Sequence, residues 1–251
     1  MANSSTYPCA YCTSSKSDLG EKKGLLRTIG SIRRNADLWT RNGGIRKNAK
    51  KFLNCAHDFL LEGEEEDTIL SKCPPPVLHI FLGIINRRFN AVAKDYQMES
   101  EAWASAANAT RHSQFGFAGR HCRNLLDKRN ILARGPADKY FQLLDSLQRV
   151  VDSCFGVALL SYYTEAIEAF CNGWINAGLP PTPKFHILKF HVPEFCERSL
   201  EGLAKYSEQT TEALHKDFDN IWQNYKMPEN HLNYKSKMCA AVVAYNSSHI
   251  L

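Results

Sequence analysis

The chain has 251 residues, of which 44% are hydrophobic and 23% charged, so it is long and apolar enough to fold around a sizeable core. Its net charge of +5 is modest for a nucleic-acid-binding protein, and no apolar run approaches the roughly 18 residues of a membrane-spanning helix. Nine cysteines, an odd number without the dense spacing of a small secreted domain, favour reduced thiols and an intracellular protein.

The amino-terminal region is expected to form short helices and turns rather than one long helix. Residues 1–20 are polar and rich in Ser and Thr, which places Cys9 and Cys12 on a turn. From Lys22 to Lys51 there are ten Lys or Arg residues and a single acid, Asp37. Such a stretch is either a solvated cationic surface or a sequence-independent contact for DNA phosphates. The candidate DNA-binding residues are Arg33, Arg34, Arg41, Arg46, Lys47, Lys50 and Lys51.

Hydrophobic spacing predicts helices along most of the remaining chain, and no alternating pattern indicates a strand. An amphipathic helix is expected over 45–61 and a buried helix from Val77, directly after three prolines. Further helices are expected over 98–109, 117–132, 137–152 and 153–177.

A proline-rich stretch, 178–183, is the expected boundary between two domains, 1–183 and 184–251. Beyond it we expect a helix over 184–198, interrupted at Pro193, and a last major helix from Ser207 to about Tyr225.

Four residues form a candidate zinc site. Cys9 and Cys12 make a Cys-x2-Cys pair, and His186 and His191 make a His-x4-His pair. Two thiolates and two imidazoles suit a closed tetrahedral zinc ion. The alternatives are a chance pair of thiols in a disordered leader, ordinary surface or core histidines, and a helical scaffold without metal.

Two longer strings carry a resemblance to a known family. His186 to Arg198 reads His-Ile-Leu-Lys-Phe-His-Val-Pro-Glu-Phe-Cys-Glu-Arg, and Ser207 to Phe218 contains Ser-Glu-Gln-Thr-Thr-Glu followed by Lys-Asp-Phe. These strings resemble the C-terminal active-site region of Transib-type DNA transposases and of the catalytic subunit of the V(D)J recombinase. The resemblance is specific over roughly residues 184–219. It implies an RNase H-like domain with a DDE triad, interrupted by a helical insertion with a Cys-x2-Cys and His-x4-His zinc site.

Carried over by position, the four Cys and His residues match structural Zn2+ ligands, and Glu212 matches the third catalytic carboxylate, with Glu208 as the competing choice. The expected fold is mainly α: the helical zinc-binding insertion plus the C-terminal helix of the RNase H-like domain, whose strands are largely missing. In that family both catalytic Asp residues precede the Cys-x2-Cys, whereas eight residues precede Cys9 here. Because one carboxylate cannot hold the Mg2+ pair of a complete triad, we expect no strand cleavage by this chain alone.

The resemblance thus implies a transposase-derived fragment whose ancestral chemistry is Mg2+-dependent DNA strand cleavage and transfer. The rival hypothesis is a non-catalytic domesticated module that kept the zinc-containing helices to bind DNA or protein. Either would act in the nucleus, and homodimerisation stays open.

Overall fold

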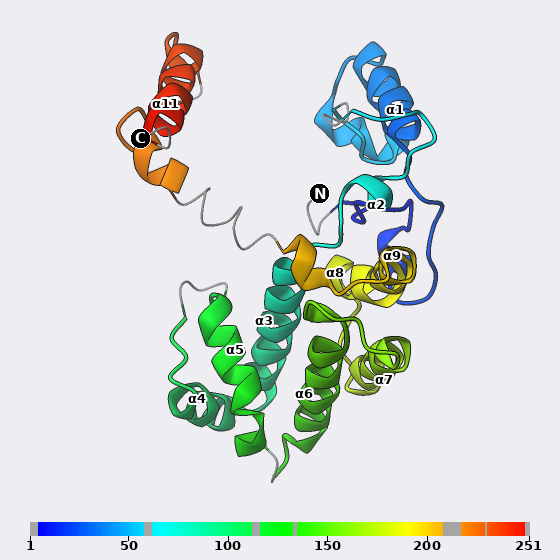
Figure 1. Ribbon diagram of the computed structural model, residues 1–251, viewed down its shortest axis with the longest axis vertical. Coiled ribbons are helices and arrows are strands. Elements are labelled where there is room, and N and C mark those ends of the chain that lie inside the picture. Colours follow the sequence, from blue (N-terminus) through cyan, green and yellow to red (C-terminus); the bar gives the residue numbers. More distant parts are fainter. Residues whose placement is uncertain are drawn as a thin grey trace. The chain divides into compact units, whose positions relative to one another are not determined.

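The computed structural model describes residues 5–57, 62–111, 116–132, 135–207, 217–228 and 230–248. Two compact units, Met1–Tyr206 and Ser207–Leu251, make up the chain. In the described residues the regular structure is helical (Figure 1), and the extended pairings are two isolated bridges, Cys12 with Leu26 and Thr28 with Thr68. The prediction of a mainly α-helical chain is therefore confirmed. None of the helices in the part of the chain described is long and apolar enough to cross a membrane.

The first unit is built around α3 (Val77–Asp95), which begins directly after Pro76. α3 packs against α4 (Gln97–Ala106), α5 (Gly119–Asp127) and α8 (Pro183–His186). Its inward positions recur every three or four residues, as an amphipathic helix requires. These buried positions are Val77, Ile80, Phe81, Ile84, Ile85, Arg88, Phe89 and Val92.

A second helix pair, α6 (Asp138–Val150) and α7 (Tyr163–Asn176), packs side by side in the same unit (Figure 1). The remaining elements are shorter or lie nearer the ends of the unit. They are η1 (Lys16–Asp18), α1 (Ile29–Arg41), η2 (Arg46–Phe52), α2 (Ile69–Lys72), η3 (Arg129–Leu132), η4 (Val151–Phe155), η5 (Ile187–His191), α9 (Val192–Ser199) and η6 (Leu203–Tyr206).

The helix predicted over 45–61 is wrong in type and length. The chain forms the 3-10 helix η2, which ends where Leu53 and Asn54 adopt positive φ angles of 53° and 63°. Hydrogen bonds to distant residues hold this reversal: the Leu53 carbonyl accepts from Arg27, and the Asn54 side chain accepts from the Tyr7 amide. These contacts override the local hydrophobic spacing, which by itself favours a longer helix.

The helix predicted over 153–177 begins too early. A π-helical turn, η4, extends α6 to Phe155, and α7 starts only at Tyr163. Between them the carbonyls of Gly156 and Val157 accept hydrogen bonds from the amides of Ala204 and Gly202, at 3.1 Å each. A Cβ atom on Gly202 would lie 2.1 Å from the Gly156 oxygen, so this close backbone approach requires glycine.

The segment 183–199 is helical throughout, as predicted, but its irregularity precedes Pro193. After α8, whose cap is the Thr182 side chain, the chain widens into the π-helical turn η5 and then continues as α9. The amide of Val192 donates to the carbonyl of Ile187, five residues earlier. Proline in a helix interior disrupts the bonding of the preceding turn, which accounts for the change at this position.

The second unit contains a helical segment over 217–222 and α11 (Tyr234–Ser248). Aromatic contacts join them: Phe218 lies 5.7 Å from Tyr245 and Trp222 lies 5.9 Å from Tyr234, measured between ring centroids. The compact units divide after Tyr206, whereas the division expected from the motifs lies at residue 183. That motif-based division stays a prediction.

Candidate metal centre

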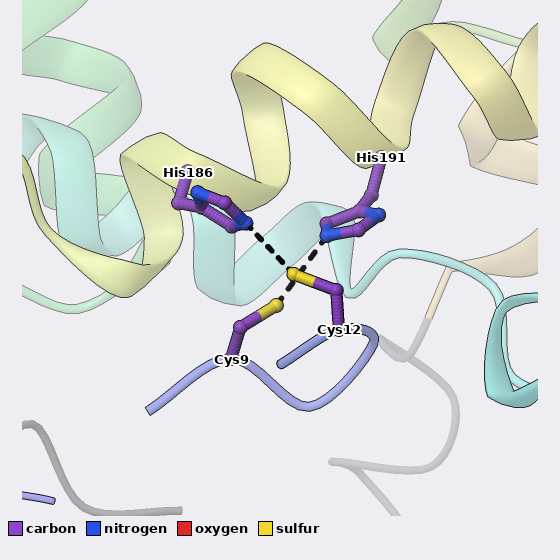
Figure 2. A group of neighbouring side chains, drawn as sticks. All are labelled: Cys9, Cys12, His186 and His191. Atoms are coloured by element: carbon purple, nitrogen blue, oxygen red, sulfur yellow. Dashed lines mark hydrogen bonds between the residues drawn. The ribbon is translucent and has the colours of Figure 1, made fainter. Parts of the chain in front are cut away.

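Four side chains from the two ends of the first unit meet at one point (Figure 2). Cys9 and Cys12 come from the amino-terminal loop, His186 from α8 and His191 from η5, and all four are fully buried. Their four possible ligand atoms lie within 4.8 Å of one another. The group could hold a metal ion such as zinc.

The distances fit a tetrahedral ion. Zinc bonds of about 2.3 Å to sulfur and about 2.0 Å to nitrogen place a sulfur and a nitrogen about 3.5 Å apart. The Cys9 sulfur lies 3.4 Å from His191 Nε2, and the Cys12 sulfur lies 3.2 Å from His186 Nε2. These two sulfur–nitrogen pairs therefore lie at nearly the separation that coordination requires.

The Cys-x2-Cys turn is tied down by backbone hydrogen bonds to a neighbouring strand-like segment. The amide of Thr13 donates to the carbonyl of Leu25 at 2.9 Å, and that of Arg27 donates to Tyr11 at 2.8 Å. Within the turn, the Tyr11 amide donates to the Cys9 sulfur at 3.4 Å. The turn is confirmed, and the alternative of a disordered leader is wrong, because both cysteines are buried in the core.

The π-helical turn η5 explains how a His-x4-His pair can serve one ion. In a regular α-helix, residues five apart differ by about 140° in direction, since each residue turns the chain by about 100°. The bond from Val192 to Ile187 spans five residues, so side chains at this spacing come nearly one above the other. The His186 and His191 rings accordingly lie 5.2 Å apart, and both point toward the cysteines (Figure 2).

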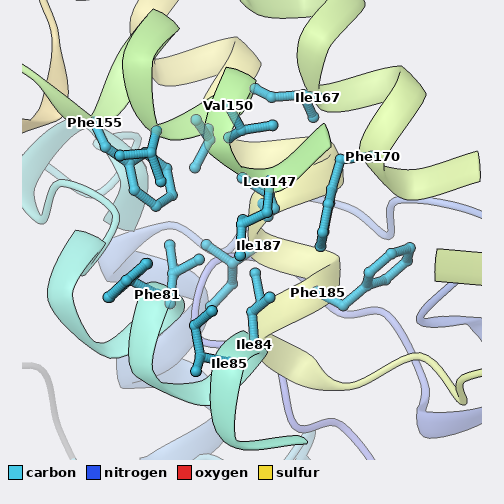
Figure 3. Close-up of a cluster of buried hydrophobic side chains, with 14 of the residues drawn as sticks. Phe81, Ile84, Ile85, Leu147, Val150, Phe155, Ile167, Phe170, Phe185 and Ile187 are labelled. Atoms are coloured by element: carbon cyan, nitrogen blue, oxygen red, sulfur yellow. The ribbon is translucent and has the colours of Figure 1, made fainter. Parts of the chain in front are cut away.

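The helix that presents the histidines is anchored in the main hydrophobic core (Figure 3). Phe185 and Ile187, which flank His186, are buried among side chains of α3, α6 and α7. Burying a large apolar side chain stabilises a fold by about 1.5–3 kcal/mol. The histidine side of the centre is thus held by packing, whereas the cysteine side is held by hydrogen bonds.

Neighbouring groups determine which ring nitrogen of each imidazole carries the proton. Nδ1 of His186 lies 2.9 Å from the carbonyl of Leu19, which can only accept, so Nδ1 carries the proton and Nε2 faces the centre as a lone pair. Nδ1 of His191 is buried without a hydrogen-bond partner, and a carboxylate oxygen of Glu194 lies 4.0 Å away. Glu194 also accepts from Lys23 at 2.9 Å. If the Glu194 carboxylate moved about 1 Å closer, it would accept a hydrogen bond from Nδ1 of His191, as the Leu19 carbonyl does from His186.

The two thiols share one hydrogen bond, which moves their pKa values apart. The pKa of Cys12 is lowered chiefly because Cys9 donates to its sulfur, while burial acts in the opposite direction. The pKa of Cys9 is raised by the same hydrogen bond and by burial. One sulfur therefore ionises readily, and a bound cation would take the place of the remaining proton.

Arg27 supports the centre and was not recognised from the sequence as anything more than one of the cations of the basic stretch. Its side chain is 1% exposed, and Nε donates to the carbonyls of Cys9 and Cys12 at 3.2 and 3.0 Å. Nη1 lies 3.1 Å from the Cys55 sulfur, and Nη2 donates to Leu53. The local signal for its burial is its nearness to Leu26 and Ile29, and this signal is weak because Leu25, in the same string, is 82% exposed.

The seven proposed DNA-binding residues lie in two different electrostatic settings. Arg33 and Arg34, on α1, lie 3.2 and 3.5 Å from the carboxylate of Glu65. The other five are exposed and form no ion pair with any residue in the part of the chain that the structure describes. These are Arg41, at the end of α1, and Arg46, Lys47, Lys50 and Lys51, in η2.

Glu208 and Glu212 lie outside the described residues, so their relation to the centre stays a prediction. No protein-family model matches the chain, and no curated protein matches it.

Proposed function

We propose that this chain is a zinc-stabilised helical region derived from a DDE transposase of the Transib and V(D)J recombinase kind. In this proposal zinc joins the amino-terminal turn to the helix at 183–199. The proposal combines the site with the motif resemblance.

The observation that carries the proposal is the convergence of two motifs from opposite ends of the sequence. Cys9 and His191 are 182 positions apart, yet their ligand atoms lie 3.4 Å from each other in a fully buried group. The resemblance implied this pairing of Cys-x2-Cys with His-x4-His. Chance pairs of thiols or imidazoles give no reason for all four to meet.

The chemistry proposed for the complete ancestral site is strand cleavage and transfer with two Mg2+ ions. Such ions stabilise the attacking and leaving oxygens of a phosphodiester and need several carboxylates to hold them. Glu212 would supply one of these carboxylates, with Glu208 as the alternative. The structural zinc takes no part in that chemistry, because four protein ligands leave no position open for substrate.

The first experiment measures zinc in the purified chain and examines the reading frame. Elemental analysis should give about one zinc per chain, and Cys12→Ser should reduce it to background. Transcripts should then be sequenced upstream of Met1. An in-frame upstream segment with two Asp-bearing strands would support the transposase assignment, and Glu212→Gln in that longer protein should abolish Mg2+-dependent cleavage without lowering zinc content.

If instead an authentic promoter precedes Met1 and translation starts there, the transposase enzyme is excluded as the present function and the non-catalytic binding module is favoured. If zinc is absent from the unmodified chain, both proposals fail, because both require the metal to hold the unit together.

A second function, binding of DNA phosphates by the basic segment, is favoured by the exposed cations of η2. Neutralising a phosphate with a cation releases a counterion, so the logarithm of affinity should fall with the logarithm of salt by about 0.9 for each contact. The double variant Lys50→Gln, Lys51→Gln should reduce that slope by about 2. Arg33→Gln is the matched control and should change it less, because Arg33 already pairs with Glu65. Equal slopes in all three proteins would exclude this function.

A further inference from the structure

A cavity of about 500 Å3 lies between α3, the start of α6 and the loop after α7. Three cationic side chains line it, Arg87, Lys94 and Lys139, together with one acid, Asp95. The backbone at 177–180, where Gly178 adopts a φ of 74°, forms part of its wall. It is distinct from the metal centre, since none of its lining residues is one of the four candidate ligands.

The lining of this cavity holds more cationic than acidic side chains. None of the three forms an ion pair with a residue in the described ranges. The carboxylate of Asp95 is engaged at 2.6 Å by the hydroxyl of Tyr140, which also lines the cavity. With three cations and one acid, the lining carries a net formal charge of +2.

A fourth cation, Arg88, lies behind Tyr140, outside the lining of the cavity. Arg88 is fully buried, its Nε donates to the carbonyl of Tyr140 at 2.9 Å, and its guanidinium lies 4.9 Å from the ring centre of Trp103. Nη1 and Nη2 have no hydrogen-bond partner. Burial lowers the pKa of Arg88 to about 9, so the group remains charged at neutral pH.

A buried charge without a counter-ion is costly, and burial strengthens its attraction for an anion nearby. An anion in the cavity would face the three cations of the lining, and Arg88, which lies behind Tyr140, would add a longer-range attraction. Arginine and lysine together are typical of phosphate recognition, with arginine supplying paired donors and lysine a compact charge. The amide of Asn90, also in the lining, can add a neutral donor.

We propose that this cavity binds a phosphate group, either free or within a nucleic-acid backbone. The site needs neither zinc chemistry nor Glu212, so it goes beyond the function proposed above. It is also separate from the cations of η2.

The test uses the zinc-loaded full chain and three probes: inorganic phosphate, a mononucleotide and a short single-stranded oligonucleotide. Binding is measured by calorimetry and by the rise in melting temperature over sodium chloride of equal ionic strength. Lys139→Gln and Arg87→Gln should each weaken binding about tenfold, the value for loss of one charged hydrogen bond. Arg120→Gln removes an exposed cation from α5 and serves as the matched control, with unchanged affinity.

Arg88→Met separates a binding role from a structural one. If Arg88 assists phosphate binding, the variant loses most of the phosphate-dependent rise in melting temperature. A purely structural Arg88 would instead change the melting temperature in chloride and leave the phosphate-dependent rise intact, and this would remove Arg88 from the site. Lys139 is exposed, so its variant tests the cavity even if Arg88→Met does not fold.

The probes also distinguish the sources. Tighter binding of the oligonucleotide than of the mononucleotide, lost in Lys139→Gln, assigns the cavity to nucleic acid; equal binding of phosphate and oligonucleotide assigns it to free phosphate. No rise with any probe, or an equal loss in Arg120→Gln and Lys139→Gln, overturns the proposal. Zinc content is measured in every sample, so a failure of the metal centre is recognised separately.

Discussion

Replacing Cys12 with serine should remove the metal and destabilise the first unit through the loop that the metal closes. Cys12 and His186 are 174 positions apart, so a bound ion closes a very long loop. The chain-entropy relation for a cross-link of this length gives about 5 kcal/mol. Hydrogen bonds from Lys189 to Gly20 and from His186 to Leu19 hold the same ends together, so this value is an upper bound for the variant.

The assay is thermal unfolding of wild type and Cys12→Ser, each with and without a zinc chelator. In a chain of this size 1 kcal/mol corresponds to about 2–4 °C, so we expect the melting temperature to fall by up to about 10–20 °C. The chelator should have the same effect on wild type and little further effect on the variant. Cys73→Ser is the control, because Cys73 is a half-buried thiol of the same unit that is not a candidate ligand.

Two results would refute the reasoning. A Cys12→Ser protein that retains about one zinc per chain would show that the ion is held elsewhere. A wild-type protein that loses its zinc with no change in melting temperature would show that the metal does not link the two ends of the unit.

Three further changes test other parts of the first unit. Arg27→Met should leave the carbonyls of Cys9 and Cys12 without their donor, which costs about 3 kcal/mol or more. It should also lower zinc affinity in a chelator competition. An unchanged affinity would assign Arg27 to folding alone. Gly202→Ala should destabilise by about 1–3 kcal/mol in urea unfolding because its Cβ meets the Gly156 carbonyl, whereas Gly156→Ala, with open space around it, should not. Burial raises the pKa of Cys122 and Cys154 to about 12, above the ordinary value of 9.0, so these thiols favour folding below pH 9 and lose that contribution as the pH rises from 9 to 12. The urea midpoint should therefore fall over this range, and it should fall less steeply in Cys122→Ala, Cys154→Ala.

The sequence predicted best where one local pattern decides the structure. α3 follows three prolines and carries an apolar stripe interrupted only by Arg88, so its start and most of its buried face could be predicted from the sequence. The four candidate metal ligands could be predicted as one group from their residue types, their spacings and the family resemblance, whereas either pair alone is a weak signal. In contrast, η2 ends at Leu53 because Arg27 and Tyr7 bond to its end from elsewhere in the fold, and no local pattern contains that information.

Arg27 shows why supporting residues are harder to predict than ligands. Its charge placed it with the exposed cations of the basic stretch, since arginine is usually exposed. In the fold it supplies donors for backbone carbonyls of the turn that carries Cys9 and Cys12. Every residue has a backbone carbonyl, so the amino-acid sequence does not show which carbonyls will need a donor. Only the apolar neighbours of Arg27 could have indicated its burial.

The spacing of the two histidines links the helix irregularity to the metal. A regular α-helix would separate residues 186 and 191 by about 140° and could not direct both rings at one ion. The π-helical turn reduces this difference, and Pro193 favours the turn because its ring would clash with the carbonyl of Lys189 in a regular α-helix. The proline and the four-residue spacing of the histidines therefore act together, and each indicates a metal site only in combination with the other. On this argument, the His-x4-His pair followed by Val-Pro is a stronger metal signal than its histidines alone, because the motif specifies the backbone geometry as well as the ligands.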